Sequence, residues 1–160
     1  MFAIVNIHIH IHTQMNHTDY SHYTVMFFIM IVSGLLSTMN VWVDKLDDIR
    51  FSINDIYMTL LMTGWMFLFM GLYYQEIPIM FIGGFIVVLF LWCIRTQFMV
   101  TYEQYMLGMI PHHSMAIHMS RKLLQLMNKP SKIKDFVTNI INTQDKEIKY
   151  MKRMLHNLRI

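Results

Sequence analysis

The sequence predicts an all-α protein in which three transmembrane helices precede an amphipathic helical hairpin. Three stretches carry no charged side chain, namely residues 20–43, 56–75 and 77–94, and about 20 apolar residues suffice for a helix to cross the hydrocarbon core. The composition agrees, since 55% of the 160 residues are apolar and only 14% are charged, against about 25% in an average soluble domain. After Arg95 the apolar residues recur at helical spacing with polar residues between them.

We place the membrane spans near residues 23–43, 56–75 and 78–95. Tyr and Trp residues stand near the ends of these segments, which is typical of the aromatic belts of membrane helices. Three buried helices of a soluble bundle are the alternative, but a soluble helix shows a polar face every turn. Within the first span, Gly34 allows close approach to a neighbouring helix.

The positive charges predict the orientation in the membrane. All 13 Lys and Arg residues fall between the first two spans or after the third, and three spans place these two segments on the same side. Because positively charged segments stay in the cytoplasm, we expect the N-terminus outside and the C-terminal hairpin in the cytoplasm. A cleavable signal peptide is not expected, since the N-terminus has no Lys or Arg and its first apolar run is too long.

A histidine-rich tail over residues 1–22 precedes the spans, and its histidines are His8, His10, His12, His17 and His22. Alternation with Ile would place three imidazoles on one face of a strand, as a metal trap. A terminal tail without fixed structure is the simpler interpretation, and translation from Met15 instead of Met1 would omit three of these histidines. The chain thus divides into this tail, a membrane region over 23–95 and a helical hairpin domain over 96–160.

The hairpin is expected to consist of two antiparallel helices over 96–127 and 131–158, because Asn128-Lys129-Pro130-Ser131 breaks the pattern. Pro111 lies inside the first helix and should kink it. Apolar side chains form one stripe along the second helix, with Gln144 at its centre and Glu147 on its edge. A buried amide or carboxylate is costly unless it is paired, so both side chains require partners.

The strongest candidate site is the stretch Met109-Ile110-Pro111-His112-His113-Ser114-Met115-Ala116-Ile117-His118-Met119. Imidazole and thioether ligands together suit soft, low-valent metals, above all Cu(I). On a helical wheel, this helix can bring four of its side chains against Gln144, Glu147 and Met151 of the second helix. We expect those four, His112, His113, Met109 and Met119, as ligands and Met151 as a further candidate. Glu147 and Gln144 would orient the imidazoles.

Each of these residues also has a structural interpretation. A pair of His113 with Glu147 or Gln144 would satisfy a buried histidine without a metal, and single methionines more often fill cores than bind ions. Catalysis is not expected, because no nucleophile accompanies Glu147 and the hairpin lacks the Glu-x-x-His pairs of di-iron oxidases. Charge-free spans argue against a transporter, and the dispersed basic residues argue against nucleic-acid binding.

Two blocks of the hairpin resemble the family called domain of unknown function 305, namely Tyr105-Met106-x-x-Met109-Ile110-Pro111-His112-His113-Ser114-x-Ala116-Ile117 and Ile140-Ile141-x-x-Gln144-x-x-Glu147-Ile148-x-x-Met151. Met15-Asn16-His17, the three spans and Arg95-Thr96-Gln97 resemble its membrane-anchored branch. The resemblance implies a ferritin-like helical fold and, in some members, copper or silver binding and tolerance. Soluble members are exported and often carry two copies of the hairpin. Since this chain carries one copy, we expect a homodimer that completes a four-helix bundle.

The residues and the resemblance together predict a multi-pass protein of the lipid bilayer that binds a soft metal ion, Cu(I), for sequestration or tolerance. Exported relatives meet copper outside the cytoplasm, whereas the charge distribution of this chain places its hairpin inside. The alternative is a metal-free membrane scaffold or assembly protein, in which the same residues form a hydrogen-bonded seam that specifies helix pairing.

Overall fold

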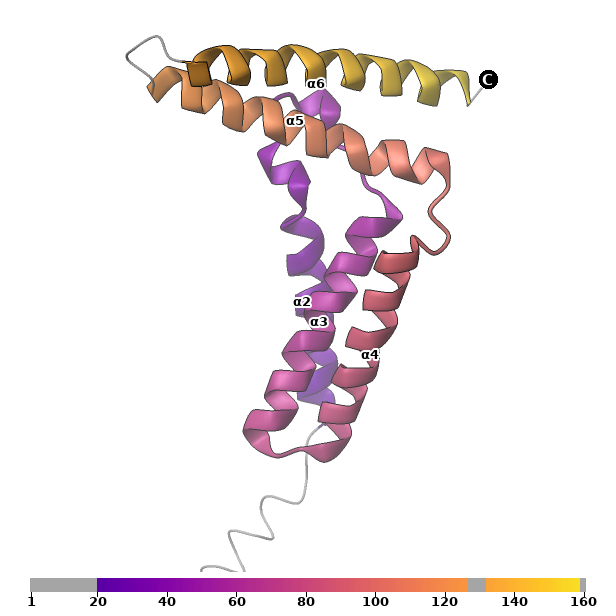
Figure 1. Ribbon diagram of the computed structural model, residues 1–160. Coiled ribbons are helices and arrows are strands. Elements are labelled where there is room, and N and C mark those ends of the chain that lie inside the picture. Colours follow the sequence, from indigo (N-terminus) through magenta and orange to yellow (C-terminus); the bar gives the residue numbers. More distant parts are fainter. Residues whose placement is uncertain (1–19, 127–131, 159–160) are drawn as a thin grey trace, which may run out of the picture.

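A computed structural model describes residues 20–126 and 132–158, which form helices and short connections and contain no strand. The helices α2 (Tyr20–Leu36), α3 (Ile53–Tyr74) and α4 (Ile77–Thr96) lie with their axes roughly aligned, and each runs opposite to the one before it in the chain (Figure 1). The segments Ser21–Trp42, Ile53–Tyr74 and Ile77–Thr96 are long and apolar enough to cross a membrane. These segments and the helices after them confirm the predicted fold class. Of the tail histidines, His8, His10, His12 and His17 lie outside the described residues, and His22 belongs to α2.

The first span lies close to its predicted limits, at Ser21–Trp42, but its helix is interrupted near the C-terminal end. The sequence predicts a helix as far as residue 43, but α2 stops at Leu36 and the 3-10 helix η1 (Met39–Trp42) follows. The side chain of Asn40 donates a hydrogen bond to the carbonyl of Arg50 at 2.7 Å and accepts one from its N–H at 3.0 Å. These two bonds hold the segment between the first two spans as a closed loop, which includes the 3-10 helix η2 (Leu46–Asp48).

Glycines set the distance between the spans. A Cβ at Gly34 would lie 2.6 Å from Cγ2 of Thr59 on α3, which confirms the close approach predicted there. On α4, a Cβ at Gly83 would overlap the backbone nitrogen of Leu68 on α3. Close backbone contact of this kind stabilises helix pairs in lipid, where burial of apolar surface from water does not drive association.

The hairpin begins later than the sequence predicts. The prediction of a helix over 96–127 is wrong at its start. α4 ends at Thr96, and the next helix, α5 (Tyr102–Leu126), begins six residues later along the chain. Gln97 and Met99 have φ angles of 51° and 54°, the left-handed conformation that ends helices. The N–H of Phe98 also bonds to the carbonyl of Cys93 at 3.0 Å. The connection therefore stops α4 and redirects the chain into the hairpin.

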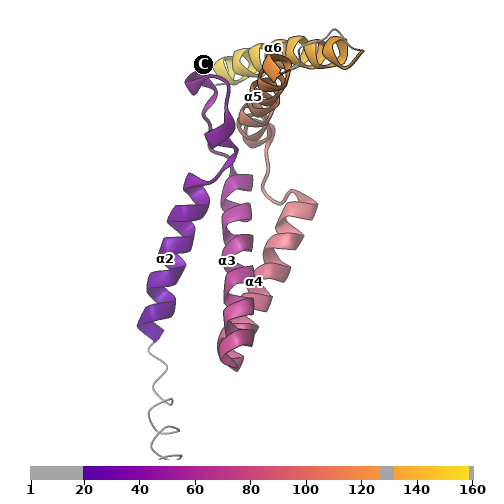
Figure 2. The same ribbon diagram turned by 90° about the vertical axis from the view of Figure 1, so that its left-hand side faces the viewer.

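The hairpin of α5 and α6 (Lys132–Asn157) lies across one end of the spans (Figures 1 and 2). Its core consists of the buried residues Met106, Leu107, Ile110, Ile117, Ile148, Met151 and Leu155. α5 packs closely against η1, η2 and α3. It continues through Pro111, which is fully buried and supplies no N–H to the helix. The Pro-His-His motif thus lies where the hairpin meets the membrane region.

Candidate metal centre

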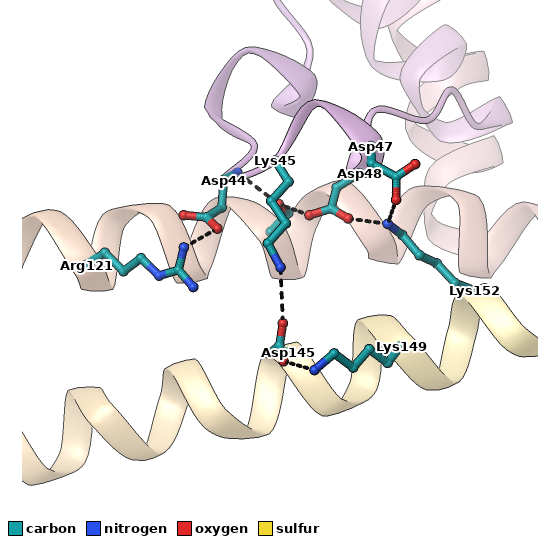
Figure 3. A network of polar contacts seen from close by, with 9 residues as sticks. Asp44, Lys45, Asp47, Asp48, Arg121, Asp145, Lys149 and Lys152 are labelled. Carbon is teal, nitrogen blue, oxygen red and sulfur yellow. Dashed lines mark hydrogen bonds and ion pairs between the residues drawn. The ribbon is translucent and has the colours of Figure 1, made fainter.

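The loop between the first two spans holds the hairpin through ion pairs (Figure 3). Four pairs connect loop and hairpin, namely Arg121–Asp44, Lys45–Asp145, Lys152–Asp47 and Lys152–Asp48. The Nη1 of Arg121 is 2.5 Å from Oδ2 of Asp44, and Nζ of Lys152 is 2.7 Å from Oδ1 of Asp48. Because both hairpin helices contribute, these pairs set the position of the whole hairpin against the loop.

The contacts shift the pKa values of Lys152, Asp47 and Asp145 in the directions that favour their charged forms. Burial acts to lower the pKa of Lys152, but its contacts with Asp47 and Asp48 outweigh burial and raise that pKa. The hydrogen bond from Lys152 in turn lowers the pKa of Asp47. The pKa of Asp145 is lowered first by its hydrogen bond with Lys149.

Ser114 is the buried centre of this contact. Its hydroxyl donates a hydrogen bond to Oδ2 of Asp48 at 2.6 Å and accepts one from the N–H of Asp44 at 2.9 Å. The side chain of Asp48 therefore meets both a hydroxyl and the ammonium of Lys152, although it is only 2% exposed. Ser114 thus fixes α5, and with it the neighbouring histidines, against the loop.

His113 faces α6. Its Nδ1 lies 3.2 Å from Oε2 of Glu147, but the two groups are not aligned for a hydrogen bond, and this nitrogen has no hydrogen-bond partner among the described residues. Burial lowers the pKa of His113 against the opposing effect of Glu147, so the imidazole is neutral near pH 7. Oε1 of Gln144 is likewise buried and lacks a hydrogen-bond partner within the described part of the chain. The interface between α5 and α6 therefore contains two buried polar atoms, on His113 and Gln144, without hydrogen-bond partners among the described residues.

The other predicted site residues do not take part in the contact between His113 and α6. Met151 packs in the hydrophobic core of the hairpin, whereas the side chain of Met119 is 54% exposed. His112 and Met109 line a cavity on another side of α5. The structure therefore divides the seven predicted residues between the helix seam, the core, the surface and this cavity.

His112 points toward the end of the first span. Its Nδ1 is 3.3 Å from Sδ of Met39 on η1. Both residues line a cavity of about 200 Å³ between α5, η1 and the start of α3. The other lining residues are Ser52, Asn54, Asp55, Met58, Gln97, Tyr105, Gly108 and Met109. The cavity thus combines residues of the hairpin with residues of the membrane region.

The start of α3 forms one wall of the cavity and is held by hydrogen bonds. The N–H and the hydroxyl of Ser52 donate to Oδ2 of Asp55 at 2.8 and 2.9 Å. The N–H of Ile53 donates to Oε1 of Gln104 on α5 at 2.8 Å. A Cβ at Gly108 would lie 3.2 Å from Oγ of Ser52, so the two walls are already in close contact. This wall is therefore fixed against α5, and the Asp55 carboxylate is engaged in capping α3.

The cavity offers one imidazole and three thioethers, from His112, Met39, Met58 and Met109. Within residues 20–126 and 132–158, no three His, Cys, Asp or Glu side chains are grouped to hold a metal ion. The lining of the cavity is of a different kind, since imidazole and thioether are soft, neutral ligands that suit Cu(I) rather than Mg²⁺ or Ca²⁺.

Sequence reasoning identifies His112 and Met109 but misses Met39 and Met58. Both lie in or beside apolar spans, where a methionine is expected to fill space. Sequence reasoning also misses the role of Ser114 and Asp48. The sequence does show that the loop and α6 carry charges of opposite sign, which indicates a contact between them. These charges do not by themselves specify which residues pair.

Comparison with known proteins gives the family of the chain. The family model described as "Domain of unknown function (DUF305)" matches residues 98–155, which include most of α5 and α6. The chain is also 40% identical over 139 residues to "Uncharacterized protein L153" of Acanthamoeba polyphaga mimivirus, in an alignment that covers 82% of this chain and 89% of that protein. No solved structure matches the chain. The hairpin motif and these two similarities together show that the chain belongs to the family of domain of unknown function 305.

Proposed function

We propose that this chain is a multi-pass membrane protein that binds a soft metal ion, Cu(I), for sequestration or tolerance. His112 and Met109 on α5 are the ligands that this proposal takes from the hairpin. The protein would hold the ion rather than carry out a reaction. The resemblance to a family with copper-binding and silver-binding members supports the choice of metal.

One observation carries the proposal: His112 and Met109, both predicted from the sequence as ligands, line the same cavity. The nearest partner recorded for Nδ1 of His112 is a thioether sulfur at 3.3 Å, which is a weak hydrogen-bond acceptor. An imidazole in such surroundings gains little from hydrogen bonding. In the tautomer that carries its proton on Nε2, the lone pair of Nδ1 is therefore available to a soft cation.

The orientation belongs to the same proposal. The loop that carries Lys45 and Arg50 lies at the same end of the spans as the hairpin (Figure 1), and the turn at Gln75, which has no basic residue, joins α3 to α4 at the opposite end. By the positive-inside rule the basic end faces the cytoplasm. The metal site would then collect Cu(I) at the cytoplasmic surface, with the N-terminus outside.

Cu(I) titration of the purified full chain in mild detergent, under reducing conditions and with a chromogenic competitor, tests the proposal. We expect one strongly bound ion in the wild type and a loss of affinity of at least about tenfold in His112→Ala. His118→Ala is the matched control, because His118 is another histidine of α5 and does not line the cavity. A His112→Ala/His113→Ala double variant should bind no better than His112→Ala.

A wild-type protein that binds no Cu(I) under these conditions would overturn the proposal and favour a metal-free scaffold. Equal affinity in the wild type and in His112→Ala would also overturn it, because the ion would then be bound elsewhere.

A further inference from the structure

We infer that Met39 and Met58, from the membrane region, supply thioether ligands to the same ion as His112 and Met109. The inference rests on the proposed function and deepens it, since it moves the metal site from the hairpin to the junction between hairpin and spans. Neither methionine belongs to the hairpin motif, and the family model begins only at residue 98.

Met39 is already at ligand distance from the histidine. With metal–nitrogen and metal–sulfur bonds of roughly 2.0 and 2.3 Å, a nitrogen and a sulfur on the same tetrahedral ion lie roughly 3.5 Å apart. Nδ1 of His112 and Sδ of Met39 are 3.3 Å apart. Both atoms can therefore bind one small ion after a slight separation.

The position of Met39 is fixed by its neighbours. Met39 begins η1, and the next residue, Asn40, makes the two hydrogen bonds with Arg50 that close the loop. Asn40 also donates to Oγ1 of Thr38 at 3.1 Å. Residues on both sides of Met39 are thus held by hydrogen bonds. The backbone of Met39 therefore has a fixed position beside His112.

Met58 supplies the third thioether from the opposite wall. It lies on α3 one turn after Asp55 and lines the cavity, with half of its side chain exposed. Because the hydrogen bonds from Ser52 to Asp55 and from Ile53 to Gln104 fix the start of α3, Met58 has a defined place opposite α5. Thioethers have three rotatable bonds and adapt readily to an ion.

The polar groups of the cavity do not form a competing site for a hard cation. Oδ2 of Asp55 accepts two hydrogen bonds from Ser52. Oδ1 of Asn54 has no hydrogen-bond partner within the described residues, and a neutral amide oxygen alone binds water better than it binds a cation. The ligand chemistry of the cavity is therefore that of a soft monovalent ion.

An ion at this place would connect three elements. His112 and Met109 lie on α5, Met39 on η1 and Met58 on α3. Metal binding would therefore tie the hairpin to the membrane region, in addition to the ion pairs on the other side of α5.

Thioether-to-leucine variants of the full chain in detergent test the inference, because leucine has nearly the volume of methionine and conserves packing. Met39→Leu and Met58→Leu should each weaken Cu(I) binding at least about tenfold, and the double variant more. Met62→Leu is the matched control for Met58→Leu, since it lies one turn further along α3 with similar exposure, 45% against 50%. Met115→Leu is the control on α5, since Met115 does not line the cavity. Both controls should bind as the wild type does.

X-ray absorption at the copper edge gives a second, independent measurement. The wild type should show sulfur neighbours together with a nitrogen, and the Met39→Leu/Met58→Leu variant should lose sulfur and keep the nitrogen. If that variant retains wild-type affinity and the wild-type sulfur signal, the inference is wrong while the proposed function stands. If the wild type binds no Cu(I), the proposed function fails and this inference fails with it.

Discussion

The hydroxyl of Ser114 on α5 donates a hydrogen bond of 2.6 Å to the carboxylate of Asp48, which lies 66 residues earlier in the loop between the first two spans. Both side chains are almost completely buried. Ser114 also accepts a hydrogen bond from the N–H of Asp44. The residue directly after the Pro-His-His motif therefore attaches the hairpin to the membrane region.

Ser114→Ala should lower the free energy of unfolding by about 1–3 kcal/mol, because it leaves a buried carboxylate oxygen and a partly buried N–H without their partner. Thermal unfolding in mild detergent measures the effect. Ser120→Ala is the control, since Ser120 lies on the same helix and is partly exposed. Equal melting temperatures for the two variants would show that the hydrogen bond between Ser114 and Asp48 does not contribute.

Lys152→Met should destabilise the protein by about 3 kcal/mol, because it leaves the buried carboxylate of Asp48 without its cation. Lys149→Met is the matched control. Lys149 pairs with Asp145 one turn earlier on α6 and is 67% exposed, and exposed pairs contribute less than about 1 kcal/mol. Chemical denaturation of both variants provides the comparison. A Lys149→Met variant that loses as much as Lys152→Met would contradict the argument from burial.

The pair of Lys152 and Asp47 also predicts how stability depends on pH. The pKa of Lys152 is raised above 10.5, so its contribution is fully present below that pH and is lost as the pH rises through the folded-state pKa. The pKa of Asp47 is lowered below 3.8, so its contribution is present above that pH and is lost as the pH falls further. Melting temperatures of the wild type and Lys152→Met across the pH range measure both effects. The alkaline loss should be smaller in the variant, and an identical alkaline loss would contradict the assignment to Lys152.

The sequence predicts the helices better than it predicts their contacts. Long charge-free stretches have few alternatives to a membrane helix, so α3 and α4 match their predicted limits closely. The end of the first span and the start of the hairpin depend on particular bonds, such as those of Asn40 with Arg50. A helical wheel cannot predict such bonds between separate segments, because it describes one helix at a time. For the same reason it turns His112 toward α6, although the residue faces Met39 on η1.

Gly83→Ala should destabilise the spans by about 1–3 kcal/mol, since the added Cβ meets the backbone of Leu68, which cannot move without shifting α3. Gly84→Ala is the control from the adjacent position. The Cβ added there lies 3.9 Å from Cδ1 of Leu68, an ordinary van der Waals distance. Unfolding of each variant in detergent should separate them clearly. Similar stabilities would indicate that α3 and α4 pack less closely than the structure describes.

We expect a homodimer through the hairpin, because α6 turns exposed apolar side chains away from the loop. Phe136 and Met154 lie five helical turns apart on the same side of α6 and are 64% and 38% exposed. Lys152, which contacts the loop, lies about 160° around the helix from Phe136. A second copy of this hairpin would cover these apolar side chains and provide the four helices of a bundle.

Phe136→Glu should therefore convert a dimer into a monomer, as measured by light scattering in mild detergent. Asn142→Glu adds the same charge at an exposed position elsewhere on α6 and should leave the dimer intact. A monomeric wild type would overturn the prediction. A Phe136→Glu variant that stays dimeric would place the interface on another surface. Burial of the exposed part of Phe136 on each copy favours association, whereas a buried glutamate without a partner opposes it.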